Sequence, residues 1–168
     1  MESYRTLIEK QRELFSTGKT KEVSFRIETL KKIRSLIKTH QNEIMDALHK
    51  DLNKSEFESY TTEIGFVLEE LRFTLKHIEN WAKPRKVKTG LTGFGSKNYI
   101  YPEPYGVVLI ISPWNYPFQL AFAPLIGAIA AGNCAILKPS ELTPKTSELL
   151  TKLIREHFQE EYIAIVEG

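Results

Sequence analysis

Hydrophobic residues in the first half of the chain recur every three or four positions, which is the spacing of one face of an α-helix. Three such runs precede residue 53, and Gly18 is suited to end the first of them. Their hydrophobic positions are Tyr4, Leu7, Ile8, Leu14 and Phe15, then Val23, Ile27, Leu30, Ile33 and Ile37, then Ile44, Leu48 and Leu52. On the second helix the expected solvent-facing residues are Arg26, Lys31, Lys32 and Arg34.

A fourth, longer helix is predicted between Ser55 and Pro84. Ser55 and Glu58 have the spacing of a capping box, in which the serine side chain accepts a hydrogen bond at the start of a helix. The helical period then continues for about seven turns. Its hydrophobic positions are Phe57, Tyr60, Ile64, Val67, Leu71, Leu75, Ile78 and Ala82. Pro84 ends the helix because proline has no N–H to donate.

The helical spacing of hydrophobic residues does not continue over residues 83–104. Two short polar runs, 86–89 and 97–101, flank three glycines, which predicts a β-hairpin with a long loop. Lysines in such strands blunt an exposed edge and disfavour aggregation. The run of basic residues at the start of this segment has no interleaved aromatics, so it favours a solvated strand edge over a nucleic-acid site.

After residue 104 short, continuous apolar runs alternate with segments of helical length. The first run is β-branched, which is typical of a strand buried on both faces. The order strand–helix–strand–helix–strand is that of half a doubly wound parallel sheet, so the fold class is α/β. The expected elements are strand 107–111, helix 118–131, strand 134–137, a helix from Pro144 to about His157 with Thr143 as N-cap, and strand 162–166.

Composition narrows the class of protein. The 168 residues are 42% hydrophobic and 26% charged, which excludes a disordered or collagen-like chain. One cysteine excludes an internal disulfide and a cysteine-based zinc site. The net charge of +2 requires no polyanionic partner, so we expect no nucleic-acid binding. The four histidines have no metal-ligand spacing, and we expect no metal.

Residues 105–137 contain no charged side chain and no histidine, which raises the question of a membrane segment. Pro113, Pro117 and Pro124 interrupt this run and several polar residues lie within it, so a buried soluble core is the better interpretation and membrane association is not expected. No targeting segment is visible near the N-terminus, which favours a cytoplasmic location.

Polar side chains follow the first two predicted strands, at the sheet edge where ligands of parallel α/β folds bind. Residues 112–115 follow the first strand and residues 138–141 follow the second. An acidic residue after the second strand is placed to accept hydrogen bonds from a ribose, although no G-x-G-x-x-G motif is present. On spacing alone Asn115 could equally be a turn residue, and Lys138 with Glu141 could be a solvated ion pair. Cys134 lies within a strand and is interpreted as an inert buried thiol.

Three motifs together carry a family resemblance. They are PYGVVLIISPWNYPF at residues 104–118, AIAAGN at 128–133 and LKPSE at 137–141. With the leading helices and the hairpin they resemble the amino-terminal part of an aldehyde dehydrogenase. The WNYPF motif is similar to that of the class 3, fatty-aldehyde-type branch. The fold that this resemblance implies is a Rossmann-like cofactor domain.

The resemblance implies roles for the residues that match these motifs. Asn115 corresponds to the asparagine whose amide donates to the oxyanion, and Lys138 and Glu141 correspond to the pair that binds the adenosine ribose. A carboxylate there favours NAD as cofactor, with NADP also used in this branch. The other implied cofactor-binding residues are Ile111, Ser112, Pro113 and Trp114 on the nicotinamide side, and Pro139 and Ser140 beside the ribose pair.

The resemblance also implies a division of the chain. We expect N-terminal helices over 1–82, an oligomerisation arm over 83–104 that supports a homodimer, and the first half of the NAD(P)-binding domain over 105–168. The family's nucleophilic cysteine and general-base glutamate lie downstream of these motifs, so the catalytic domain is absent from the 168 residues. We therefore expect the parent enzyme to oxidise an aldehyde to a carboxylic acid through a cysteine thiohemiacetal, and this chain alone to be inactive. The alternative is a non-catalytic module that dimerises with, or caps, a full-length relative.

Overall fold

The computed structural model describes residues 4–90, 93 and 95–168. Three helices open the chain, as the hydrophobic spacing predicted, and Gly18 adopts the left-handed conformation after the first of them (φ 79°). The helical half consists of α1 (Tyr4–Ser16), a 3-10 turn (Lys19–Lys21), α2 (Val23–Thr39), α3 (Gln41–Leu52), α4 (Glu56–Ser59), a π-helical turn (Tyr60–Ile64) and α5 (Gly65–Trp81).

The predicted fourth helix is interrupted. Ser55 caps α4 by accepting a hydrogen bond from the Glu58 amide, as expected. The π-helical turn then inserts an extra residue and changes which side chains face the core. The prediction that Phe57 and Tyr60 belong to the buried stripe is therefore wrong, since both side chains are exposed. Later positions of the stripe are buried at Ile64, Val67, Leu71 and Ile78.

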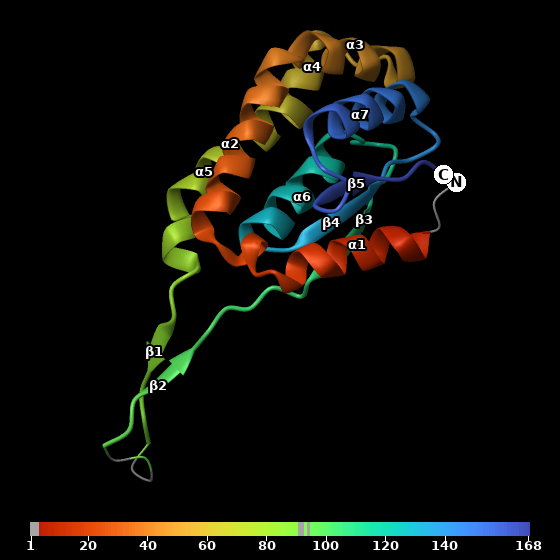
Figure 1. The fold of residues 1–168 in the computed structure, drawn as a ribbon. Helices are drawn as coiled ribbons and strands as arrows, with labels where there is room; N and C mark the ends of the chain where they lie inside the picture. Colours follow the sequence, from red (N-terminus) through yellow and green to blue (C-terminus); the bar gives the residue numbers. More distant parts are fainter. Residues whose placement is uncertain (1–3, 91–92, 94) are drawn as a thin grey trace.

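The second half forms a parallel three-stranded sheet with strand order β3-β4-β5. Helices α6 and α7 pack on the sheet, and α1 lies along β3 and β4 (Figure 1). The bounds are β3 (Val107–Ile111), α6 (Gln119–Ala131), β4 (Cys134–Lys138), α7 (Pro144–His157) and β5 (Ile163–Ile165). The strand–helix–strand–helix–strand order confirms the predicted α/β class.

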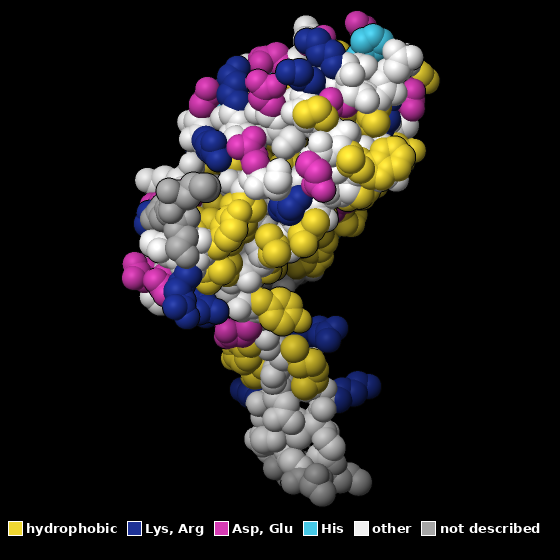
Figure 2. All heavy atoms as spheres, turned by 90° about the vertical axis from the view of Figure 1, so that its right-hand side faces the viewer, with side chains coloured by type: hydrophobic (Ala, Val, Ile, Leu, Met, Phe, Trp, Pro, Cys, Tyr) yellow, Lys and Arg dark blue, Asp and Glu magenta, His cyan; other side chains and the backbone are white. Residues whose placement is uncertain are grey.

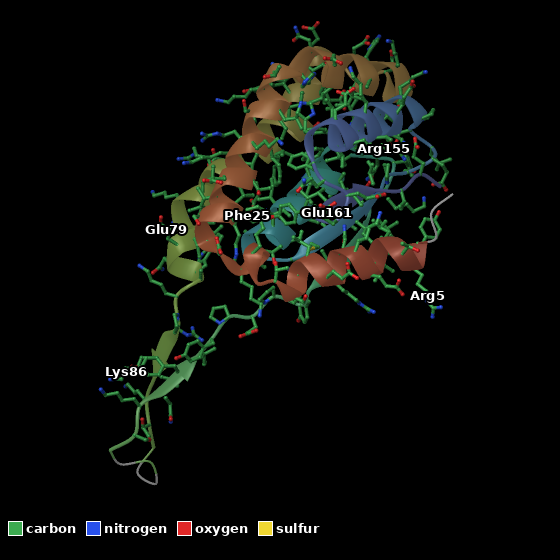
Figure 3. All side chains as sticks on the ribbon, in the orientation of Figure 1. Arg5, Phe25, Glu79, Lys86, Arg155 and Glu161 are labelled. Carbon is green, nitrogen blue, oxygen red and sulfur yellow. The ribbon has the colours of Figure 1, made fainter. Side chains whose placement is uncertain are left out.

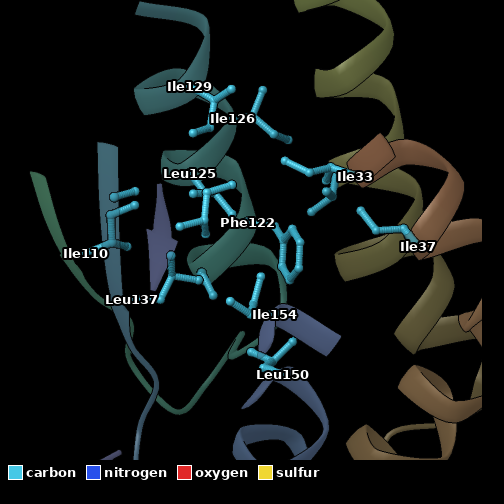
Figure 4. Packing of buried hydrophobic residues seen from close by; sticks show 14 of the residues in the cluster. Ile33, Ile37, Ile110, Phe122, Leu125, Ile126, Ile129, Leu137, Leu150 and Ile154 are labelled. Atoms are coloured by element: carbon cyan, nitrogen blue, oxygen red, sulfur yellow. The ribbon is translucent and has the colours of Figure 1, made fainter. Parts of the chain in front are cut away.

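Helix α6 is the centre of the hydrophobic core. Its side chains Phe122, Leu125 and Ile129 are fully buried between the sheet on one side and α2 and α5 on the other (Figure 4). Burial on both sides explains why this segment is apolar nearly all round. Among the described residues no helix combines the length and the apolar run needed to cross a membrane.

Strand β3 departs from the prediction that both of its faces are buried. It lies at one edge of the sheet, and Leu109 and Ile111 are 61% and 67% exposed. Ile110, on the opposite face, is buried against the core. Hydrophobicity alone predicted a covered strand, but α1 packs beside Val107 on the face of Leu109 and Ile111 and leaves these two side chains exposed. Figure 2 looks from the right-hand side of Figure 1 and shows hydrophobic side chains gathered on that side.

Arg26 was expected on the solvent side of its helix, and this is wrong. Its guanidinium is buried and donates to the carbonyls of Thr20, Lys21 and Ala130, at 2.9, 2.6 and 3.1 Å. Burial lowers the pKa of Arg26. Gly132 passes so close that a Cβ there would lie 2.8 Å from the guanidinium carbon. Arg26 therefore fastens the start of α2 to the end of α6.

Thr143 occupies the N-cap position of α7, as predicted, but its side chain does not provide the cap. The carboxylate of Asp51 accepts hydrogen bonds from the amides of Lys145 and Thr146, at 3.0 and 2.7 Å. A residue at the end of α3 thus satisfies the first turn of a helix more than ninety positions later.

The predicted hairpin is an arm that projects from the body of the molecule (Figure 1). Strands β1 (Arg85–Val87) and β2 (Asn98–Ile100) pair antiparallel, with Lys86 opposite Tyr99. Figure 3 places the Lys86 side chain on this arm, away from the helices. Residues 91, 92 and 94 of the expected loop lie outside the described residues.

Candidate functional site

The two polar segments found in the sequence lie at one edge of the sheet. Strands β3 and β4 are parallel neighbours in which Ile111 pairs with Lys138. The Ser112 amide continues this ladder by donating to the Lys138 carbonyl at 3.0 Å. Residues 112–115 and 138–141 therefore leave the sheet side by side, at the carboxyl ends of the strands where α/β folds bind ligands.

Lys138 and Glu141 form an ion pair on this edge. The ammonium lies 2.9 Å from Glu141 Oε2, and the side chains are 30% and 62% exposed. The hydrogen bond from Lys138 holds the pKa of Glu141 below its usual value. Between them Pro139 and Ser140 are buried, and the Ser140 hydroxyl accepts from the Leu142 amide at 3.2 Å. The turn is thus fixed, while the carboxylate stays open to solvent.

The segment after β3 presents its side chains differently. Pro113, Trp114 and Asn115 are exposed, whereas the Ser112 hydroxyl is buried without a hydrogen-bond partner. Asn115 precedes α6 by four residues. An exposed carboxamide beside a carboxyl-end strand edge can donate to a developing negative oxygen, provided that its backbone is held in place.

A buried cation that was not predicted from the sequence lies beneath this segment. Lys54, between α3 and α4, is 8% exposed, and its ammonium donates to the backbone carbonyl of Asn115 at 3.0 Å. The same ammonium lies 4.1 Å from the centre of the Tyr116 ring. It also pairs with Glu63 Oε1 at 2.5 Å. Nothing adjacent to Lys54 indicates this role, because Glu63 is 9 residues away and Asn115 is 61 residues away.

Glu63 is the second missed residue and is fully buried. Its Oε2 accepts from the backbone amides of Phe118 at 2.9 Å and Gln119 at 3.1 Å, at the start of α6. A signal for it was present in the sequence. Glu63 stands four residues before Val67 and therefore on the apolar stripe of the predicted helix, where an isolated charge requires buried partners.

Cys134 is placed as the sequence suggested. Its thiol is buried in β4, and burial raises its pKa to about 11. A thiol with a raised pKa is almost wholly protonated at neutral pH, so Cys134 is no nucleophile in this fold.

An apolar groove of about 490 Å³ runs between α1 and the open face of the sheet, and reaches Lys138. Leu7 and Ile8 line its helical side, and Leu109 and Ile136 line its strand side. The groove adjoins the ion pair, so the sheet edge combines an apolar surface with an accessible carboxylate.

The aldehyde dehydrogenase family model matches residues 1–168. The chain belongs to the aldehyde dehydrogenase family. It is 52% identical over 154 residues, or 92% of its length, to 4,4′-diaponeurosporen-aldehyde dehydrogenase of Staphylococcus aureus, and 37% identical over its whole length to the "dimeric NADP-preferring" aldehyde dehydrogenase of the dog. Other relatives are family 3 members, which agrees with the class 3 resemblance.

A solved structure of Staphylococcus aureus AldH in a substrate-bound state aligns with the whole of this chain, with a TM-score of 0.97 and 48% identity. The chain covers 37% of that structure, and 34% and 37% of the two curated relatives. It therefore spans about a third of their length and corresponds to their N-terminal part.

Proposed function

We propose that this chain supplies the oxyanion donor and the ribose-binding edge of an NAD(P)-dependent aldehyde dehydrogenase. Such an enzyme oxidises an aldehyde to a carboxylic acid through a thiohemiacetal on a cysteine outside these 168 residues. The observation that carries the proposal is the convergence of residues 112–115 and 138–141 on one sheet edge, in a chain of this family.

Asn115 is the proposed catalytic residue. Attack of a thiolate on an aldehyde carbonyl places a negative charge on the carbonyl oxygen. A fixed amide donor stabilises that charge, and one donor contributes roughly 3 kcal/mol in other enzymes. The exposure of Asn115 lets its carboxamide reach a substrate held against the sheet edge.

Lys138 and Glu141 are the proposed ribose-binding pair. The exposed Glu141 carboxylate can accept hydrogen bonds from ribose hydroxyls, and Lys138 can donate to them, so the residues fit the cofactor. When bound, NAD(P)+ supplies the acceptor for the substrate's hydride. A negative charge at Glu141 favours the free 2′-hydroxyl of NAD over the 2′-phosphate of NADP. The proposed nicotinamide side comprises residues 111–114, and Pro139 and Ser140 complete the ribose turn.

The arm over residues 83–104 is proposed to join two copies. It projects from the body, and its exposed Tyr99, Ile100 and Tyr101 offer an apolar surface to a partner. In the proposed division of the chain, the arm separates the helices of residues 1–82 from the first half of the cofactor-binding domain, residues 105–168. Sedimentation of the chain with and without Tyr99→Ser and Tyr101→Ser tests the arm, and an unchanged dimer in the double variant would contradict it.

The catalytic role is tested in a chimeric enzyme, called the joined enzyme below, in which this chain replaces the matching N-terminal third of the Staphylococcus aureus relative. Asn115→Ala lowers kcat for aldehyde-dependent NADH formation by about 100-fold. The control is Asn42→Ala, on the exposed side of α3, which leaves kcat unchanged. Equal kcat values for the parent and Asn115→Ala would contradict the proposal. The chain by itself is expected to show no activity.

The exposed edge of β3 favours a second candidate, a non-catalytic module that associates with a longer relative. Co-elution of the chain with the full-length Staphylococcus aureus relative in size-exclusion chromatography would support it. Separate elution would leave the enzyme role as the better account.

A further inference from the structure

A buried ion pair lies directly under the segment that carries Asn115. The ammonium of Lys54 and the carboxylate of Glu63 are 8% and 0% exposed, which is unusual for two ionised side chains. Removing two charges from water is costly unless each ion finds further hydrogen bonds. The position of those further bonds therefore indicates what the pair holds.

Within the part of the chain that the structure describes, the Lys54 ammonium and the Glu63 carboxylate make their further hydrogen bonds and ring contact with residues 115–119. Lys54 binds the Asn115 carbonyl and lies over the Tyr116 ring. Glu63 accepts from the amides of Phe118 and Gln119. The pair thus grips the backbone on both sides of Pro117, once by a cation and once by an anion at the positive end of α6.

We propose that the Lys54–Glu63 pair is a positioning device for the Asn115 carboxamide. The inference rests on the proposed function of Asn115. An oxyanion donor is effective only when it is held within about 0.5 Å of the productive position. Residues 113–116 are exposed, and the buried pair holds the backbone at Asn115 and at Phe118 and Gln119. The pair touches no reacting atom and acts through Asn115.

The π-helical turn explains how Glu63 reaches this place. The Gly65 amide bonds back to the Tyr60 carbonyl across five residues, which widens the turn. A Cβ at Gly65 would lie 2.9 Å from that carbonyl oxygen, so glycine permits the close approach. The widened turn directs both Glu63 and Ile64 inward, one to α6 and one to the core.

The anchoring is tested by hydrogen exchange on the chain itself. Glu63→Gln keeps the volume of the side chain but removes its charge and one of its two acceptor oxygens. We expect the amides of Phe118 and Gln119 to exchange at least about 10-fold faster in this variant, relative to amides in α2. The matched control is Glu69→Gln, at an exposed glutamate paired with Arg72. Unchanged exchange at residues 118 and 119, or an equal acceleration throughout the domain, would overturn the inference.

A double-variant cycle in the joined enzyme separates positioning from simple stabilisation. We expect Glu63→Gln to lower kcat by at least about 10-fold, with KM for NAD unchanged. In the Asn115→Ala background it causes no further loss, because the group that it positions is gone. Multiplication of the two effects would contradict the inference while leaving the role of Asn115 intact. An unchanged kcat in Asn115→Ala would remove both.

Discussion

Two lysine–glutamate pairs lie near the candidate site, and they differ chiefly in burial. Lys54 and Glu63 are enclosed and bonded to the backbone of another segment, whereas Lys138 and Glu141 are bonded to each other at the surface. A buried pair cannot exchange its partners for solvent or ligand, and an exposed pair can. The same chemistry therefore serves a fixed support in one place and, as we propose, a ligand contact in the other.

Replacing the lysine of each pair is expected to give the largest difference in stability between the two pairs. Lys54→Met leaves a buried carboxylate without its counter-ion and lowers the free energy of unfolding by about 3–5 kcal/mol. Lys138→Met leaves an exposed carboxylate that water solvates, so the urea midpoint stays where it is. The check is urea unfolding followed by circular dichroism. Equal losses in the two variants would contradict the contrast.

Removing both buried charges sharpens the comparison. In Lys54→Met/Glu63→Leu no charge is left unpaired, and apolar replacements of buried pairs are often neutral or stabilising by about 1–4 kcal/mol. We expect this double variant to recover part of the stability that Lys54→Met loses, because the amides of Phe118 and Gln119 still lack their acceptor. Its kcat in the joined enzyme stays low, because the anchors of the Asn115 segment are absent. A double variant as active as the parent would show that the pair serves stability alone.

Straightening the π-helical turn has a smaller effect. Gly65→Ala forces the new Cβ away from the Tyr60 carbonyl and is expected to cost about 1–2 kcal/mol. Gly127→Ala in α6 is the control, since a Cβ there meets nothing within 4 Å. Thermal unfolding of both variants measures the difference, and equal melting temperatures would argue against a tight turn.

Titration of the exposed pair gives the smallest effect. Because Lys138 lowers the pKa of Glu141, the carboxylate stays ionised at a pH below 4.5, the usual pKa of a glutamate. Whatever stability the pair contributes is present above that value and is lost as the pH falls through the lowered pKa. An NMR titration of the Glu141 carboxyl carbon should give a midpoint below 4.5 that rises in Lys138→Met. A midpoint that does not move would show that the pair is unformed in solution.

The sequence predicted the elements and the polar segments after the strands better than the buried polar contacts. Residues 112–115 and 138–141 follow strands directly, so local pattern was enough to place them. Gln11 and Glu63 lie on the apolar stripes of their helices, Arg26 was predicted on the solvent side, and all three are buried. Each binds backbone groups elsewhere in the fold, as Gln11 does with the carbonyls of Ala135 and Glu160, and the partners of such residues cannot be known before the tertiary structure.

The errors in predicting β3 and the π-helical turn have a similar cause. The hydrophobic run of β3 predicted burial correctly for Ile110 and wrongly for Leu109 and Ile111. The sequence shows that a strand is apolar, but it does not show which element covers each face of that strand. The π-helical turn was missed because one added residue leaves the surrounding helical period intact on either side.

The most direct test of the account compares Glu63→Gln and Glu141→Gln in the joined enzyme. We expect the two variants to affect different kinetic constants. Glu63→Gln lowers kcat and leaves KM for NAD unchanged, because it loosens the oxyanion donor, whereas Glu141→Gln raises KM for NAD and leaves kcat unchanged, because it weakens a ribose contact. If both variants altered the same kinetic constant, the division into a buried supporting pair and an exposed binding pair would be contradicted.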